Sequence, residues 1–123
     1  MLVEEVMEDP YVIEKDIKMS EAAKLMSENN TDCLIFFLKE DIKGIITERD
    51  ILKNFKKNKK VSQIMTKDVI IIESDKDLSD ALRLMQENKI KRLPVVKEGK
   101  LIGIISATDL LANSDELDED YFF

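Results

Sequence analysis

The feature that most constrains this chain is an internal repeat. Three pairs of segments match in sequence, namely 3–7 with 61–65, 19–29 with 78–88, and 44–52 with 103–111. The pairs occur in the same order in both halves of a chain of 123 residues. A unit of half this length buries too little apolar surface to be stable by itself. The repeat therefore predicts two small units of one design that stack on each other.

Each copy predicts the same order of elements: a short helical turn, a strand, an amphipathic helix, two strands and a second helix. In the second copy Leu78, Ala81, Leu82 and Met85 fall on one face of a helix. The first strand is predicted at 11–13 and 69–72, and the paired strands at 34–38 with 42–46 and at 93–96 with 101–105. We therefore expect an α+β fold, with two β-α-β-β-α repeats related by a pseudo-two-fold axis.

The repeated segments divide the chain into repeat 1 at 1–57, repeat 2 at 58–112 and an acidic tail at 113–123. The lysine-rich stretch 56–60 is interpreted as a solvated linker, with a basic binding patch as the alternative. We expect the tail to be mobile. Docking of its three terminal aromatic residues, 121–123, on a neighbour is the alternative.

The composition excludes several classes of site. The chain has no histidine and one cysteine, Cys33, so it forms neither a Cys/His zinc site, nor a disulfide, nor a histidine-based triad. We predict no metal site and no catalytic site. A net charge of −7 argues against nucleic acid as a partner. No apolar run is long enough to cross a membrane, and the first residues lack signal-peptide character, so a cytoplasmic location is expected.

One motif carries chemistry, the sequence Gly-Ile-Ile-Thr/Ser-x-x-Asp at each predicted strand-to-helix junction. Thr47 or Ser106 can donate a hydrogen bond to a phosphate oxygen. Asp50 or Asp109, one helical turn later, can accept hydrogen bonds from two neighbouring ribose hydroxyls. The same residues also fit a capping box, which needs no ligand. The two roles are compatible, and the spacing alone leaves both open.

The order of these motifs resembles the CBS domain, named after cystathionine β-synthase. The matching segments are 61–66, 81–85, 91–96 and 103–109 in the second copy, and 6–7, 22–26 and 44–52 in the first. The resemblance implies a tandem pair with two clefts that bind AMP, ADP, ATP or S-adenosylmethionine. Because some members bind no known ligand, a protein-interaction module with empty clefts is the alternative.

The resemblance also implies which residues contact a ligand. The first cleft would use the turn residues Thr47 and Asp50, the apolar pair Ile70 and Ile71, and the run Lys91, Arg92 and Pro94. The second would use Ser106, Asp109, Val12 and Ile13, with Asp32 and Cys33 where the first has cations. An acid at that position disfavours phosphate, so we expect the first cleft to bind a charged nucleotide more tightly than the second.

An enzyme is the competing class, in the form of a magnesium-dependent hydrolase that uses Asp50 and Asp109. The repeat would place these carboxylates in different clefts, so we expect no paired-carboxylate site. The resemblance implies instead a regulatory module in which ligand shifts a conformational equilibrium and an effector protein reads the change. It also implies a homodimer that associates through helices, for which the candidate residues are Leu25, Leu52, Leu84 and Leu111.

Overall fold

The computed structural model describes residues 1–116, so the end of the predicted tail, 117–123, lies outside the described residues. The chain forms two compact units. One unit is Tyr11–Val69, and the other combines Met1–Pro10 with the chain from Ile70 onward. Each unit contains one three-stranded sheet. We call them the β1–β3 unit and the β4–β6 unit after their strands.

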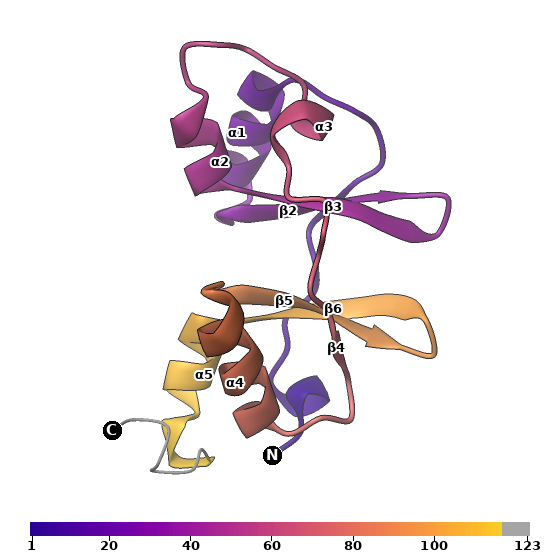
Figure 1. Cartoon of the computed structure of the whole chain (residues 1–123), viewed down its shortest axis with the longest axis vertical. Coiled ribbons are helices and arrows are strands. Elements are labelled where there is room, and N and C mark those ends of the chain that lie inside the picture. Colours follow the sequence, from indigo (N-terminus) through magenta and orange to yellow (C-terminus); the bar gives the residue numbers. More distant parts are fainter. Residues whose placement is uncertain (117–123) are drawn as a thin grey trace. The chain divides into compact units, whose positions relative to one another are not determined.

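The β1–β3 unit has a mixed sheet with its helices on one face (Figure 1). The strand order is β1-β2-β3, in which β1 is parallel and β3 antiparallel to β2. Its elements are β1 (Val12–Ile13), α1 (Met19–Glu28), β2 (Cys33–Leu38), β3 (Asp41–Thr47), α2 (Glu48–Lys53) and α3 (Val61–Ile64).

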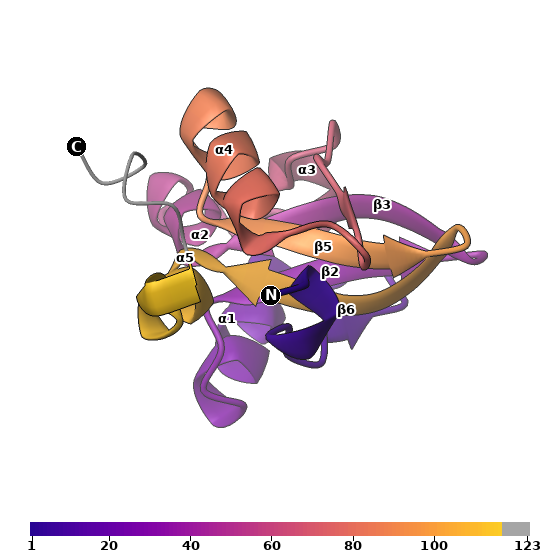
Figure 2. The same cartoon turned by 90° about the horizontal axis from the view of Figure 1, so that it is seen from below.

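The β4–β6 unit repeats this arrangement, with α4 lying across its sheet (Figure 2). Its elements are η1 (Val3–Glu5), β4 (Ile72–Glu73), α4 (Leu78–Asn88), β5 (Arg92–Lys97), β6 (Lys100–Ser106), α5 (Ala107–Ala112) and η2 (Ser114–Glu116). The predicted α+β class and the order of elements in each repeat are confirmed.

Each unit has its own hydrophobic core between helices and sheet. Alternate residues of the middle strand point into it, Leu34 and Phe36 from β2 in one unit, and Leu93 and Val95 from β5 in the other. The helices contribute residues spaced by one turn, such as Ala81 and Met85 of α4. Burial of these stripes is the main term that stabilises each unit.

We call the start of each repeat, residues 3–8 in one and 61–66 in the other, its opening segment. Each opening segment packs with the elements of the other repeat. Val61 is fully buried in the core of the β1–β3 unit, and Val3 is fully buried in the core of the β4–β6 unit. Thr66 exchanges two backbone hydrogen bonds of 3.0 Å with Ile45 at the edge of β3. Glu8 does the same with Ile104 of β6 at 2.9 Å. The sequence repeats and the compact units are therefore different divisions of the chain.

A glycine lies where each opening segment crosses its sheet. A Cβ atom on Gly44 would lie 2.7 Å from Met65 Cγ and 2.9 Å from the Thr66 carbonyl oxygen. On Gly103 it would lie 2.9 Å from Met7 Cγ. In both sheets the pairing register shifts by one residue beside this glycine. These glycines are needed because a methionine side chain occupies the space that a larger residue would fill.

The predicted strand at 69–72 is wrong in extent, because β4 begins only at Ile72. In the β1–β3 unit the Ile35 N–H donates to the Tyr11 carbonyl oxygen at 2.9 Å, directly before β1. Pro94 takes the place of Ile35 in the other unit and has no N–H to donate. Within the described residues the Ile70 carbonyl oxygen therefore lacks this hydrogen bond, and pairing starts at Ile72 with Val95.

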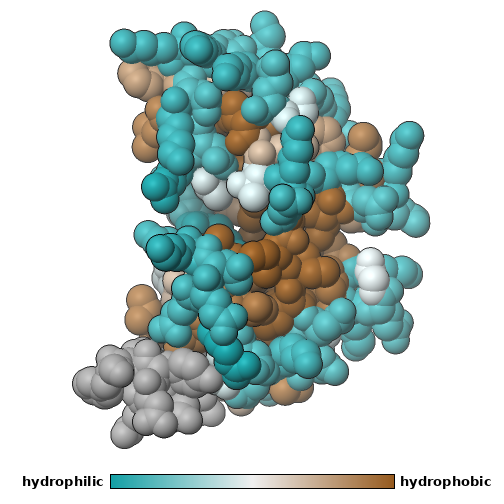
Figure 3. Space-filling model, viewed as in Figure 1, coloured by the Kyte–Doolittle hydropathy of each residue, from teal (hydrophilic) through white to brown (hydrophobic). Residues whose placement is uncertain are grey.

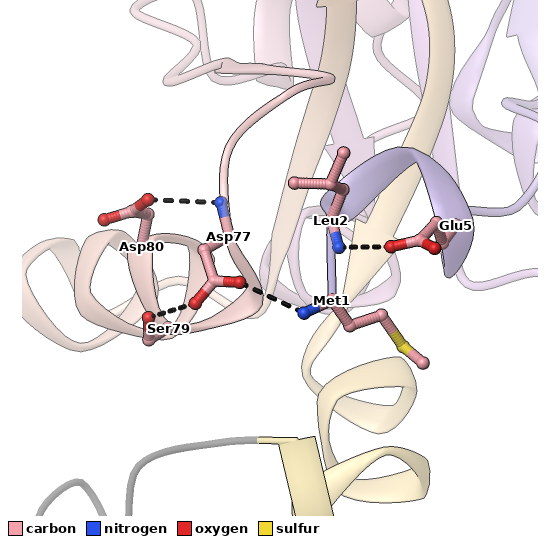
Figure 4. A network of polar contacts seen from close by, with 6 residues as sticks. All are labelled: Met1, Leu2, Glu5, Asp77, Ser79 and Asp80. Atoms are coloured by element: carbon pink, nitrogen blue, oxygen red, sulfur yellow. Dashed lines mark hydrogen bonds and ion pairs between the residues drawn. The ribbon is translucent and has the colours of Figure 1, made fainter.

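Polar contacts fasten both opening segments. In the β4–β6 unit the amino group of Met1 lies 3.3 Å from Asp77 Oδ1, and the Ser79 hydroxyl donates to Asp77 Oδ2 at 2.7 Å (Figure 4). The Ser79 hydrogen bond, opposed by burial and assisted by the Met1 amino group, lowers the pKa of Asp77. In the β1–β3 unit Ser62 donates to Asp16 from its amide at 2.9 Å and from its hydroxyl at 2.6 Å.

The contact between Ser62 and Asp16 predicts a pH-dependent contribution to stability. Burial raises the pKa of Asp16, but the Ser62 hydrogen bonds and the charge of Lys60 outweigh it, so the pKa lies below the ordinary 3.8. The contact therefore stabilises the fold above that pH and is lost as pH falls through the lowered pKa. Ser62→Ala should cost about 1 kcal/mol at pH 7 in urea unfolding, since the pair is exposed.

The cost of Ser62→Ala should shrink steadily in unfolding curves recorded below pH 3.8. Ser27→Ala on α1, an exposed serine whose hydroxyl makes no hydrogen bond within the described residues, is the control. An equal cost at pH 7 and at pH 3 would rule out the charged Asp16 as the reason.

Candidate functional site

The first candidate site is the turn between β3 and α2. Asp50 Oδ2 accepts hydrogen bonds from the Thr47 amide at 2.9 Å and from the Thr47 hydroxyl at 3.2 Å. Both residues are half-buried. The other carboxylate oxygen, Oδ1, accepts no hydrogen bond from the part of the chain that the structure describes. The turn thus holds one oxygen by local contacts and leaves the second oxygen as an acceptor in a fixed orientation.

The turn between β6 and α5 has the same geometry. Asp109 Oδ2 accepts from the Ser106 amide at 2.9 Å and from the Ser106 hydroxyl at 3.0 Å, and the Asp109 amide donates to the hydroxyl at 3.2 Å. This is the capping arrangement that the spacing also predicted. In both turns the hydroxyl proton is used within the cap, so a phosphate would receive it only after the hydroxyl rotates away.

Each turn lies next to the start of the middle strand of its own sheet. Arg92 pairs with Ser106 across the strands, and the Ala107 amide donates to the Lys91 carbonyl oxygen at 2.8 Å. In the other unit Cys33 pairs with Thr47, and the Glu48 amide donates to the Asp32 carbonyl oxygen. The cations Lys91 and Arg92 thus flank the Ser106 turn, and an acid flanks the Thr47 turn.

The apolar residues assigned to ligand contact differ in exposure. Ile71 is 43% exposed, Val12 is exposed and Ile70 is half-buried. Ile13 is 7% exposed and packs in the core of its unit, and Pro94 is fully buried. On the face of the β4–β6 unit drawn in Figure 3, apolar atoms form a broad brown area. Ile71 and Val12 are therefore the most exposed members of this apolar group.

Two asparagines support the turns and were not singled out from the sequence. Asn54 Nδ2 donates to the Asp50 carbonyl oxygen at 2.8 Å, and Asn113 Nδ2 donates to the Asp109 carbonyl oxygen at 2.9 Å. They close the short helices α2 and α5 from the other end. The signal was present, because the asparagine follows the aspartate at the same spacing in both copies.

Residues 1–116 contain neither a metal-binding cluster nor a membrane-spanning helix. No three residues of the types His, Cys, Asp or Glu lie together in a way that could hold a metal ion. Among the helices described, none combines the length and the apolar character that a membrane crossing requires.

Two β-α-β-β-α repeats, each with a hydroxyl–carboxylate turn between its last strand and the helix that directly follows it, define a class of tandem-repeat proteins. The CBS domain profile matches residues 3–57 and again residues 61–116. The chain belongs to the CBS domain family, and a pair of such domains is generally a regulatory module.

Curated relatives carry this pair within longer proteins. An uncharacterized 17.7 kDa protein of Acidianus ambivalens is 41% identical over 105 residues, which are 81% of this chain and 64% of that protein. The inosine-5'-monophosphate dehydrogenase of Methanocaldococcus jannaschii is 39% identical over 110 residues, 88% of this chain and 22% of the enzyme. The chain thus spans less than two thirds of the length of either relative, and the similarity to the dehydrogenase is confined to its CBS domains.

Solved structures agree in fold over nearly the whole chain. The CBS domain pair of protein MJ0100, in complex with 5'-methylthioadenosine and S-adenosyl-L-methionine, has a TM-score of 0.86 and 28% identity and covers 94% of this chain and 96% of its own. A hexameric CBS-CP12 protein from bloom-forming cyanobacteria has a TM-score of 0.84 and 30% identity, covering 94% of this chain and 72% of its own.

Proposed function

We propose that this chain is a regulatory CBS pair of the cytoplasm that binds an adenosine-containing ligand, catalyses no reaction and relays the ligand level to an effector protein. The ligand is AMP, ADP, ATP or S-adenosylmethionine. Support for the adenosine class comes from MJ0100, which binds 5'-methylthioadenosine and S-adenosyl-L-methionine through a CBS pair of the same fold.

One observation supports this function above the others, the geometry of the two aspartates. Asp50 and Asp109 each have one oxygen held by their own turn and one oxygen without a hydrogen-bond donor in the described chain. A carboxylate fixed in this way accepts from vicinal hydroxyls with little loss of side-chain entropy. A ribose offers such a pair of hydroxyls, and a helix cap alone has no use for the second oxygen.

We propose that the Thr47–Asp50 turn and the Ser106–Asp109 turn bind their ligands with different affinities. We keep the assignment of Thr47, Asp50, Ile70, Ile71, Lys91, Arg92 and Pro94 to one ligand, and of Ser106, Asp109, Val12 and Ile13 to the other. Pro94 supports the first assignment, because it leaves the Ile70 carbonyl oxygen as an acceptor for an adenine amino group. The corresponding oxygen of Tyr11 is already used by Ile35.

Local charge supports the Ser106 turn instead as the place for a phosphate, since Lys91 and Arg92 flank it within its own unit. Substitution of these cations should weaken the binding of anionic ligands at either turn, so it does not tell the two turns apart. Only the separate removal of Asp50 and Asp109 ranks the turns.

A ligand panel tests the proposed function. We expect one of AMP, ADP, ATP, S-adenosylmethionine and 5'-methylthioadenosine to raise the melting temperature of the full chain by several degrees at about 100 times its Kd, where binding adds about 2.7 kcal/mol. Guanosine monophosphate serves as the control nucleotide. If none of the five raises the melting temperature, the interaction module with empty clefts becomes the better account.

We also propose that the chain self-associates through α2 and α5, as a homodimer. Leu52 and Leu111 occupy equivalent positions on these helices and are 69% and 68% exposed, whereas Leu25 and Leu84 are half-buried against their cores. Large exposed leucines at repeated positions are typical of an interface. The hexameric CBS-CP12 neighbour shows that a chain of this fold can assemble.

The combined substitution Leu52→Glu and Leu111→Glu is expected to shift the chain to monomer in sedimentation velocity, because it would bury four charges at a two-fold interface. Leu38→Glu, at the hairpin end of β2, is the control and should leave the distribution unchanged. A monomeric wild type, or an unchanged distribution for the double variant, would exclude these helices.

A further inference from the structure

The segment that follows α2 forms a cationic surface with an exposed aromatic ring. Residues 51–67 contain six lysines and no acidic residue. Phe55 is 70% exposed, and the Lys56 ammonium lies 5.8 Å from the centre of its ring. Lys18 pairs with Lys60 through an isolated β-bridge and so adds a cation from outside the segment. We give the name lysine surface to Phe55, Lys18, Lys53, Lys56, Lys57, Lys59 and Lys60.

The lysine surface lies wholly within the β1–β3 unit, and the backbone of that unit holds it in place. The Met19 amide donates to the Lys59 carbonyl oxygen at 2.8 Å, and the Ser20 amide donates to Asn58 Oδ1 at 3.2 Å. Within residues 1–116, none of its lysines forms an ion pair. The end of the unit that carries α2 and α3 is hydrophilic in Figure 3. The lysine charges are therefore available for contact with another molecule.

The other repeat shows that the fold does not need these lysines. Residues 55–57 are Phe-Lys-Lys, and the corresponding residues 114–116 are Ser-Asp-Glu. The preceding asparagine, by contrast, is the same in both copies, and it closes its short helix in both, as Asn54 and as Asn113. A repeat thus folds with acids at this place as well as with lysines. The lysine surface points to a contact outside the fold.

The distribution of charge indicates what kind of molecule makes this contact. The β1–β3 unit has 12 basic and 10 acidic residues, but outside 51–67 it has 6 basic and 10 acidic residues. A nucleic acid or an anionic membrane would extend beyond the lysines and meet this acidic surplus. A short acidic segment of a protein would not. An exposed ring surrounded by charged side chains is also typical of a protein interface, which has an apolar centre and a polar rim.

We propose that an acidic segment of the effector protein binds the lysine surface, with its carboxylates on the lysines and an aromatic side chain on Phe55. The inference rests on the proposed function, because that function requires an effector protein that reads the ligand level. It assigns the effector contact to the β1–β3 unit, at a surface that contains none of the residues assigned to the adenosine ligand.

Fluorescence anisotropy of labelled peptides added to the full chain tests the proposal. One short peptide consists of Glu and Asp with a single central Phe, and a matched peptide has Ala in place of the Phe. We expect saturable binding at about 0.15 M salt, about threefold tighter or more for the Phe peptide, since a pair of aromatic rings adds to the attraction between charges. In about 1 M NaCl, where the Debye length is about 3 Å, the affinity should fall roughly tenfold or more.

Three variants identify the surface that binds the peptides. Phe55→Ser keeps every lysine and should remove the difference between the two peptides. Lys56→Gln with Lys57→Gln should weaken both peptides roughly fivefold. Lys97→Gln with Lys100→Gln, in the hairpin of the other unit, is the matched control and should leave both affinities unchanged. Equal affinity of the wild type for the two peptides, or an equal loss in both lysine pairs, would overturn the proposal.

Other occupants are tested under the same conditions with a single-stranded oligothymidine of the same length and with vesicles that contain phosphatidylserine. If either binds more tightly than the Phe peptide, and Lys56→Gln with Lys57→Gln abolishes that binding, the occupant is nucleic acid or membrane and the proposal is wrong. The melting panel of adenosine ligands is run without peptide. Its failure would reject the proposed ligand, while the peptide affinities would still decide for or against the lysine surface.

Discussion

Replacing Gly44 with alanine is expected to destabilise the fold by about 1–3 kcal/mol, the usual cost of an added methyl group in a packed site. The new Cβ would lie 2.7 Å from Met65 Cγ and 2.9 Å from the Thr66 carbonyl oxygen. Thr66 cannot retreat freely, because its backbone forms two hydrogen bonds with Ile45. Urea unfolding followed by circular dichroism measures the loss, and the melting temperature should fall by several degrees.

A double-mutant cycle shows whether the contact with Met65 is the cause. Met65→Ala removes the side chain that the new methyl group would meet, so the two substitutions together should cost less than the sum of their separate costs. Gly99→Ala is the control for conformation, since Gly99 has a φ of +78° but open space around it. If the unfolding free-energy changes of Gly44→Ala and Met65→Ala add strictly, the contact between Met65 and the new methyl group is not the cause of the loss.

Replacing Asp50 with alanine is expected to lower the affinity for the adenosine ligand about 100-fold or more. A hydrogen bond to a charged group contributes about 1.5–3 kcal/mol, each 1.4 kcal/mol is a factor of ten, and two ribose hydroxyls would lose their acceptor. Asp109→Ala should act in the same way on the ligand of the other turn. Calorimetric titration of each variant measures both affinities and ranks the two turns.

The loss of a helix cap has to be separated from the loss of a ligand contact. Asp80→Ala on α4 is the matched control, because Asp80 accepts the Asp77 amide at 3.2 Å, as Asp50 accepts the Thr47 amide. It should lower stability by about 1 kcal/mol and leave ligand affinity unchanged. If Asp50→Ala and Asp109→Ala behave like Asp80→Ala, the aspartates are caps and nothing more.

Much of the fold could be predicted from local pattern. The stripe Leu78, Ala81 and Met85 predicted α4, and these residues are fully or nearly fully buried. The repeated motif placed Thr47 and Ser106 at the start of a helix, where both cap it. These features depend on residues close in sequence, so a single sequence is enough to reveal them.

Contacts between distant segments could not be predicted in this way. Val3 and Val61 match in sequence, but nothing local shows that each is buried with the elements of the other repeat. The start of β4 at Ile72, one position later than that of β1, follows from Pro94, which lies more than twenty residues away and acts through a missing N–H. The roles of the candidate ligand residues from both repeats depend on the same long-range packing, so they remain predictions.

The central claim, that a fixed aspartate accepts a ribose in this chain, is tested most directly by comparing a ligand with its deoxy form. The adenosine ligand chosen by the melting panel and its 2'-deoxy analogue are titrated into the full chain by calorimetry. We expect saturable binding of the ribose form and at least about tenfold weaker binding of the deoxy form, since one hydrogen bond to the carboxylate is lost. Equal affinity for the two forms, or no binding of either, would contradict the account.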